Sequence, residues 1–224
     1  VTNMYAASWS GGKDGCLATY RAVQQGLRVR VLLNTIADTY QRVRFHGTPK
    51  DFVHAQAEAM GLQLLQWPTP DDTYEKSYRA ALRELKSRGV EGMVFGDIFP
   101  EANRDWGVRM CQAVGLDAVH PIYGMETRQV MAEFLGAGFE AVIVSGRPDL
   151  FSGEQMGMPL GPEFLAWAAA QPGLDVCGEN GEYHTVVVDG PLFRQRLEIT
   201  EGEPVQVNGH WFLDVRGWEL RGKD

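Results

Sequence analysis

The sequence contains few cysteines, no long apolar run and fewer basic than acidic residues. The three cysteines are widely spaced and form no CxxC pair, which argues against a disulfide framework and a cysteine-rich zinc site. No stretch of about 18 apolar residues is available to span a bilayer. The N-terminal sequence lacks the basic region and long apolar run of a signal peptide. We therefore expect a cytoplasmic protein that does not enter a membrane.

Positive charge is scarce, with 21 Lys and Arg residues against 29 Asp and Glu residues and a formal net charge of −8. Non-selective binding to nucleic acid requires a basic face, so no nucleic-acid partner is expected. The phosphate-binding patterns GxxxxGK[ST] and GxGxxG are both absent. The 224 residues suffice for one large or two small domains, and a homodimer remains open.

Short apolar runs alternate with amphipathic segments through the first half of the chain. This alternation predicts an α/β fold with a doubly wound parallel five-stranded sheet, whose ligand lies at the carboxyl ends of the strands. Reversal of the strand order beside the first strand would bring residues 10–15 close to Gly96 and Asp97. Strands are expected at residues 4–9, 29–34, 62–67, 93–95 and 116–120, and helices at residues 15–25, 52–60, 72–88 and 103–114.

The third of these helices carries its own end signals. Asp72 and Glu75 have the spacing of a capping box, and Gly89 stands where a left-handed C-terminal cap is expected.

After about residue 124 the pattern changes to a smaller α+β region. A helix at residues 127–137 and a buried strand at residues 140–145 predict one more β/α unit. The remainder predicts antiparallel strands, with Asn208-Gly209 as a hairpin turn. We therefore expect two domains, residues 1–124 and residues 125–224. The other predicted elements are a helix at 162–170 and strands at 183–188, 197–200, 205–207 and 211–215.

The segment between the first strand and the first helix predicts a phosphate site. Its glycines let backbone N–H groups approach an anion at a helix N-terminus. Lys13 adds a charge suited to phosphate oxygens, and Asp14 could bind Mg²⁺ or the helix's own amides. A tight strand–helix turn that merely needs glycines is the alternative. The predicted phosphate loop consists of Ser10, Gly11, Gly12, Lys13, Asp14 and Gly15.

The sequence SGGKD at residues 10–14 resembles the PP-loop SGGxDS of the N-type ATP pyrophosphatases. The resemblance implies an adenine nucleotide alpha hydrolase-like fold and the use of ATP with Mg²⁺. It also implies cleavage between the α and β phosphates, so that the substrate becomes an adenylate. Gly15 stands in place of the serine of the motif, which removes one hydroxyl from the phosphate shell.

Two further segments, CGENGEYHT at residues 177–185 and DGPLF at residues 189–193, are similar to the C-terminal signature of the diphthine–ammonia ligase family. This resemblance implies an ATP-dependent carboxylate–ammonia ligase that releases AMP and pyrophosphate. Its partners would be ATP, ammonium and, where the organism makes it, diphthine on elongation factor 2. Residues 1–124 would then bind ATP and residues 125–224 the acid. Asn180 and His184 depart from the more usual GEGGEYET form.

The two acidic residues of this signature, Glu179 and Glu182, flank an Asn-Gly turn, so both carboxylates are expected to project into a crevice. There they could bind ammonium, hold Mg²⁺ or act as a general base. An exposed acidic hairpin is the alternative. The predicted catalytic residues are Lys13, Asp14, Glu179 and Glu182, with Asp14 as metal ligand. ATP contacts are expected from the loop with Asn34, His46, Gly96 and Asp97, and substrate contacts from Glu179, Asn180, Gly181, Glu182, Tyr183, His184 and Thr185.

Two rival functions remain open. One is a ligase for another small carboxylate, or a PP-loop enzyme that modifies tRNA, although the net charge and the missing CxxC weigh against tRNA. The other is a sensor that binds ATP or AMP without turnover, which Gly15 favours.

Overall fold

The computed structural model describes residues 3–36 and 47–223. Contacts divide the chain into two compact units that are not continuous in sequence. The first unit holds residues 1–10, 14–44 and 62–125, and the second holds residues 11–13, 45–61 and 126–224. A division into independently folding domains at residue 124 stays a prediction.

The first unit is built on a parallel sheet with the strand order β3-β2-β1-β4-β5. This order confirms the predicted five-stranded doubly wound fold and makes β1 and β4 neighbours. The positions that follow these two strands are therefore close in space, as expected. The strands are β1 (Met4–Ser8), β2 (Arg28–Ile36), β3 (Gln63–Pro68), β4 (Val90–Val94) and β5 (Asp117–Val119).

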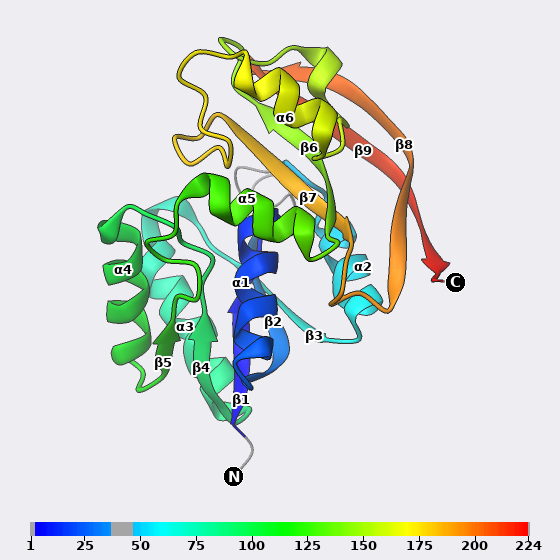
Figure 1. Ribbon diagram of the computed structural model, residues 1–224. Helices are drawn as coiled ribbons and strands as arrows, with labels where there is room; N and C mark the ends of the chain where they lie inside the picture. Colours follow the sequence, from blue (N-terminus) through cyan, green and yellow to red (C-terminus); the bar gives the residue numbers. More distant parts are fainter. Residues whose placement is uncertain (1–2, 37–46, 224) are drawn as a thin grey trace. The chain divides into compact units, whose positions relative to one another are not determined.

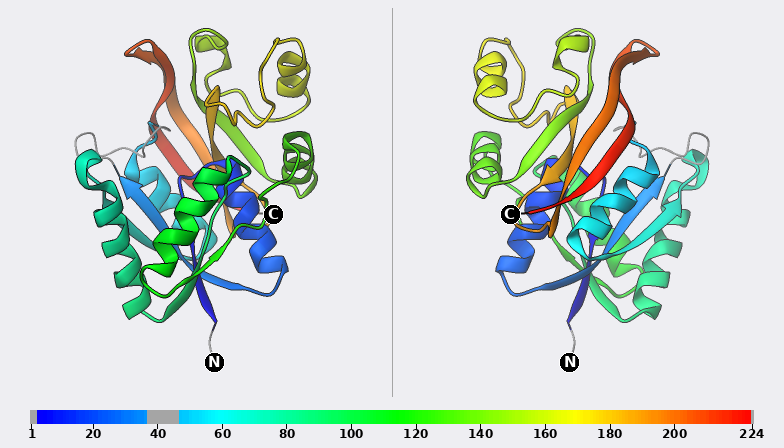
Figure 2. Two further views of the ribbon diagram at one scale, coloured as in Figure 1. Left: turned by 90° about the vertical axis from the view of Figure 1, so that its left-hand side faces the viewer. Right: turned by 90° about the vertical axis from the view of Figure 1, so that its right-hand side faces the viewer.

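Helices cover both faces of this sheet. Helix α1 (Lys13–Gln24) lies on one face, and α3 (Tyr74–Ser87) and α4 (Glu101–Gln112) lie on the other (Figures 1 and 2). Side chains of α3 at helical spacing point toward the sheet and form an apolar core with strand residues. Burial of this apolar surface is the main contribution that holds the layers together. The centre of that core includes Val31, Leu33, Tyr78, Leu82, Leu85, Met93 and Met110.

The predicted capping box at the start of α3 is wrong. A short 3-10 helix, Asp71–Thr73, precedes α3, so Thr73 is the N-cap residue and its side chain makes no capping hydrogen bond. Glu75 instead accepts hydrogen bonds from Trp106 Nε1 at 3.1 Å and Arg109 Nη2 at 2.8 Å. Gly89 has φ of +86°, which confirms the expected left-handed residue after the helix.

The second unit is built on an antiparallel sheet with the order β7-β6-β9-β8. A buried strand is present at β6, but the prediction that it belongs to one more β/α unit is wrong. Strand β6 pairs antiparallel with β7 and β9. The two short strands expected after residue 195 form one strand with a register shift near Glu201. Asn208 and Gly209 both have positive φ and confirm the hairpin turn. The strands are β6 (Glu140–Gly146), β7 (Tyr183–Asp189), β8 (Gln195–Val207) and β9 (His210–Gly222).

The helices of the second unit include one from the first half of the chain. Helix α2 (Lys50–Met60) connects β2 to β3 in sequence, yet its Phe52 packs edge-on against Trp218 with ring centroids 5.4 Å apart. Arg194 N–H also donates to Ala59 O at 2.7 Å. The other helices are α5 (Thr127–Gly136), the 3-10 turn Gly153–Gln155 and α6 (Pro162–Ala169). Within residues 3–36 and 47–223, no helix combines the length and apolarity needed to cross a membrane.

Candidate functional site

The predicted phosphate loop is fastened to the edge of β7 through Gly11. Its carbonyl oxygen accepts hydrogen bonds from Val187 N–H at 2.8 Å and from Gln56 Nε2 at 3.0 Å. Gln56 Nε2 also donates to Val187 O at 2.8 Å. Gly11 has φ of +89°, and a Cβ there would lie 2.7 Å from Gln56 Oε1. Backbone conformation and close packing therefore both require glycine at this position.

Lys13, the first residue of α1, is buried against the signature segment. Its N–H donates to Thr185 Oγ1 at 3.2 Å, and its ammonium group donates to Cys177 O. The ammonium nitrogen also lies 5.4 Å from the centroid of the Tyr183 ring. Only 4% of Lys13 is exposed. The second unit thus brings together the two sequence motifs, although phosphate binding by Lys13 stays a prediction.

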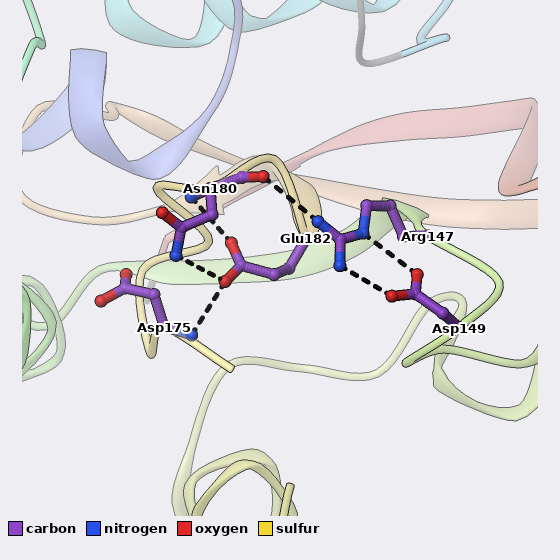
Figure 3. Close-up of polar contacts among 5 residues, drawn as sticks. All are labelled: Arg147, Asp149, Asp175, Asn180 and Glu182. Atoms are coloured by element: carbon purple, nitrogen blue, oxygen red, sulfur yellow. Dashed lines mark hydrogen bonds and ion pairs between the residues drawn. The ribbon is translucent and has the colours of Figure 1, made fainter. Parts of the chain in front are cut away.

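Glu182 does not project into a crevice, and this expectation is wrong. Its carboxylate is turned into its own loop, as Figure 3 shows, and only 1% of the residue is exposed. One oxygen accepts from Asp175 N–H and Asn180 Nδ2, both at 3.0 Å, and the other accepts from Asn180 N–H at 2.8 Å. Three donors from Asp175 and Asn180 converge on the buried carboxylate, which therefore holds the loop together. These donors share no simple sequence spacing. Glu179 is partly exposed.

Two residues that sequence reasoning missed complete this loop. Asp175 Oδ1 accepts from the backbone N–H groups of Cys177 at 2.8 Å and Glu179 at 3.3 Å. Arg147 forms a two-pronged ion pair with Asp149 and donates to Asn180 O at 3.4 Å (Figure 3). The position of Asp175 two residues before Cys177 is typical of an Asx turn and could have been recognised. Nothing in the sequence spacing predicts the role of Arg147.

At the start of β7, successive side chains lie on opposite faces of the sheet, so Tyr183 and His184 have different surroundings. Tyr183 packs between Phe151 and Phe164, with ring centroids 5.5 and 5.2 Å away, and its hydroxyl donates to Val176 O at 2.6 Å. His184 lines a separate cavity of about 410 Å³. Burial, followed by the positive charge of Lys13, lowers the pKa of His184 to about 4. The imidazole is therefore neutral near pH 7.

In the first unit, Gly96 permits a close approach to the start of α1. A Cβ on Gly96 would lie 2.6 Å from Gly15 N and 2.7 Å from Gly15 Cα. The predicted proximity of Gly96 to residues Asp14 and Gly15 is therefore present. Asp97, the next residue, has Oδ2 at 3.4 Å from Nδ1 of the buried His120.

The ring of His120 stacks on Phe95, with ring centroids 4.9 Å apart. Its placement against Asp97 is a contact of the candidate site.

The remaining predicted nucleotide contacts have different outcomes. Asn34 is buried, its Nδ2 donates to Trp9 O at 2.9 Å and its Oδ1 accepts from Gln66 Nε2 at 3.2 Å. The side chain therefore fastens the end of β1 to β3, and a nucleotide contact stays a prediction. His46 lies outside the described residues. Ser10 and Asp14 are partly exposed and Gly12 is buried.

The donor set constrains any metal ion. Among the described residues, no three His, Cys, Asp or Glu side chains gather as a metal site. Mg²⁺ usually takes one or two carboxylates together with substrate phosphates and water. Asp14 at the start of α1 fits a metal that arrives with a nucleotide, whereas an all-protein metal cage does not fit.

Known proteins resemble the chain over most of its length. Diphthine–ammonia ligases from Rattus norvegicus and Danio rerio are each 25% identical to it. The alignments cover 97% and 88% of the chain, and 90% and 86% of these relatives. The crystal structure of a predicted subunit of tRNA methyltransferase from Methanocaldococcus jannaschii superposes with a TM-score of 0.46 at 11% identity. That superposition covers 84% of the chain and 98% of the other chain.

Family profiles account for both halves of the sequence. The diphthamide synthase N-terminal domain matches residues 4–118, and the diphthamide synthase C-terminal domain matches residues 126–219. The resemblance predicted from the SGGKD and GENGEYHT motifs is thus confirmed. The chain belongs to the diphthamide synthase family and is an enzyme of the ATP-dependent ligase class.

Proposed function

We propose that the chain adenylates a carboxylate with ATP and then converts the adenylate into an amide with ammonia. One observation carries this proposal. Lys13 of the phosphate-loop motif is hydrogen-bonded to both Cys177 and Thr185, at the two ends of the signature segment. A residue that joins both motifs can couple the binding of ATP to the order of the segment that would receive the acid.

The phosphate loop would bind ATP mainly through its backbone. Backbone N–H groups at the N-terminus of a helix favour negative charge, and at α1 the first of them, that of Lys13, already donates to Thr185. The hydrogen bonds of Gly11 to Val187 and Gln56 fix the loop before ATP arrives, which lowers the entropic cost of binding. Asp14 would hold Mg²⁺, which supplies charge neutralisation at the phosphates when it is bound.

The proposed chemistry has two displacements. A carboxylate oxygen attacks the α phosphorus of ATP, and the bond to the β phosphate breaks to release pyrophosphate. Ammonia then attacks the acyl carbon, the bond to AMP breaks, and one proton leaves the nitrogen. Of the two predicted acidic groups, the partly exposed Glu179 is the better placed to accept that proton, because the Glu182 carboxylate is occupied within its loop.

The names of the relatives support diphthine as the acid, and the resemblance to the family's signature implies that it is carried on elongation factor 2. A different small carboxylate is the alternative. The other expectation, a sensor that binds ATP without turnover, does not agree with membership of the ligase family, although Gly15 stands in place of the motif's serine.

Product analysis tests the proposal. The purified chain is incubated with ATP, ammonium and diphthine-bearing elongation factor 2, and the nucleotides are separated. We expect AMP and pyrophosphate in equal amounts, and a loss of at least about tenfold in rate for Lys13→Ala. Lys76→Ala, an exposed lysine of α3, is the matched control. Release of ADP and phosphate would contradict adenylation, and binding of ATP without any product would favour the sensor.

A further inference from the structure

The cavity beside His184 has a floor made by three neighbouring strands. Ser145 of β6 is the register partner of His184 on β7 and of Phe212 on β9. Partners directly across antiparallel strands present their side chains on the same face of the sheet. His184, Ser145 and Phe212 therefore form one row across the sheet, and all three line the same cavity of about 410 Å³.

The rim of the cavity comes from two other segments. Val207, Asn208 and His210, at the tip of the β8–β9 hairpin, line one side. Arg147 and Gly181 line the other, and Arg147 is held there by Asp149 and Asn180. Glu182 holds Asn180 in place, and Asn180 in turn accepts from Arg147. The buried carboxylate therefore helps to position this side of the rim through Asn180.

The lining of the cavity indicates the chemistry of its ligand. Among the described residues, the lining holds a guanidinium, two imidazoles and a hydroxyl but no carboxylate. Such a set provides donors for an anionic oxygen, although Asp149 already pairs with two nitrogens of the Arg147 guanidinium. The ring of Phe212 adds a flat apolar wall, and that ring is held in place by Gly47, where a Cβ would lie 2.6 Å from Phe212 Cδ1.

We propose that this cavity binds the acid substrate, a carboxylate on a side chain that carries a flat ring. Arg147, Ser145 and His184 bind the polar atoms, and Phe212 packs against the ring. A volume of about 410 Å³ is sufficient for one extended side chain. This inference rests on the proposed function, because it names where the acid of that reaction is bound. It replaces the two glutamates of the signature as the main acid-binding groups.

The cavity is also within electrostatic reach of the phosphate loop. Burial lowers the pKa of His184 most, and the charge of Lys13 lowers it further, so the two groups interact electrostatically. Because the imidazole of His184 is neutral near pH 7, it would orient a carboxylate through a hydrogen bond and not through an ion pair.

Steady-state kinetics with two variants test the site. His184→Gln removes the imidazole, and Val207→Trp adds bulk at the rim, where the valine is 52% exposed and the substitution should be tolerated. His54→Gln, an exposed histidine of α2, is the matched control. We expect the KM for diphthine-bearing elongation factor 2 to rise about tenfold or more in both cavity variants. The KM values for ATP and ammonium should stay within about twofold of the unsubstituted chain.

Direct binding separates this inference from the proposed function. Titration calorimetry measures the affinity of diphthine-bearing elongation factor 2 for the same three variants. AMP formation with an unchanged acid KM in both cavity variants would overturn the inference and leave the function standing. Binding that is lost in both variants, with no AMP from the unsubstituted chain, would support the cavity and overturn the function. Absence of binding to the unsubstituted chain would overturn the inference.

Discussion

Each unit holds its own candidate functional segment in place, and the two units do so by different physical means. In the first unit, the segment after β4 is placed by a backbone approach so close that Gly96 leaves no room for a Cβ. In the second unit, the segment before β7 is placed by charged side chains that are buried and hydrogen-bonded, chiefly Glu182 and Lys13. The segment after β4 should therefore not tolerate added atoms, and the segment before β7 should not tolerate the loss of a charged side chain.

The largest effect is expected for Glu182→Ala, which tests the second half of this comparison. The change leaves two backbone N–H groups and one side-chain amide without their buried acceptor, so the free energy of unfolding should fall by about 4 kcal/mol. Urea denaturation measures the loss. Glu58→Ala, an exposed glutamate of α2, should change it little. A loss below about 1 kcal/mol for Glu182→Ala would show that the loop does not depend on the carboxylate.

Gly96→Ala tests the first half. The new Cβ would meet backbone atoms of Gly15, which cannot rotate away, so we expect a loss of about 3 kcal/mol and weaker ATP binding. Gly136→Ala is the control, because no atom lies within 4 Å of the position that its new methyl group would take. Equal stability of the two variants in urea would mean that the close approach is not required.

Acid should destabilise the second unit through His184. Its folded pKa of about 4 lies below the ordinary 6.5, so the unfolded chain binds the proton first as pH falls. The contribution of His184 to stability is therefore lost progressively below pH 6.5, by about 2 kcal/mol at pH 5. His184→Gln should remove this part of the pH dependence, and His54→Gln should not. Parallel unfolding curves for all three chains at pH 7 and pH 5 would refute the assignment.

Lys13→Met keeps the length of the side chain and removes its charge. Because Cys177 O loses a buried donor, the free energy of unfolding should fall by about 1.5 kcal/mol. Lys76→Met provides the matched change at an exposed lysine. If both substitutions have the same small effect in thermal unfolding, the ammonium group does not fasten the signature segment.

The smallest effect is expected at Gly15. A Cβ there would lie 3.3 Å from Ser8 O, so Gly15→Ser should cost less than about 1 kcal/mol of stability. If the hydroxyl of the motif contacts phosphate, the KM for ATP should fall about fivefold. Gly15→Ala adds the carbon without the hydroxyl and should leave the KM unchanged. The same KM for both variants would show that the hydroxyl has no part in ATP binding.

The parallel sheet can be predicted because its strands, helices and glycine turns follow one repeated pattern. The sequence predicts the wrong setting for strand β6, because a fully buried apolar run has the same pattern in parallel and antiparallel sheets. Likewise, the apolar face of α2 predicts that the helix packs against another element. It does not predict that this element carries Trp218, which is far away in the sequence.

In the candidate site, the sequence identifies Gly11 and Gly96 because the local backbone geometry demands glycine there. It does not predict the orientation of Glu182, which depends on the donors Asp175 and Asn180 converging in space. The cavity residues Ser145 and Phe212 come together only through strand register, which no short motif records.

The attachment of Gly11 to β7 has a consequence for the solubility of the protein. An edge strand offers unpaired backbone groups to other chains, and such edges promote aggregation. At Val187 the outward N–H is taken by Gly11 O and the carbonyl by Gln56 Nε2. The same three residues that shape the phosphate loop therefore also shield this edge of the sheet from pairing with another molecule.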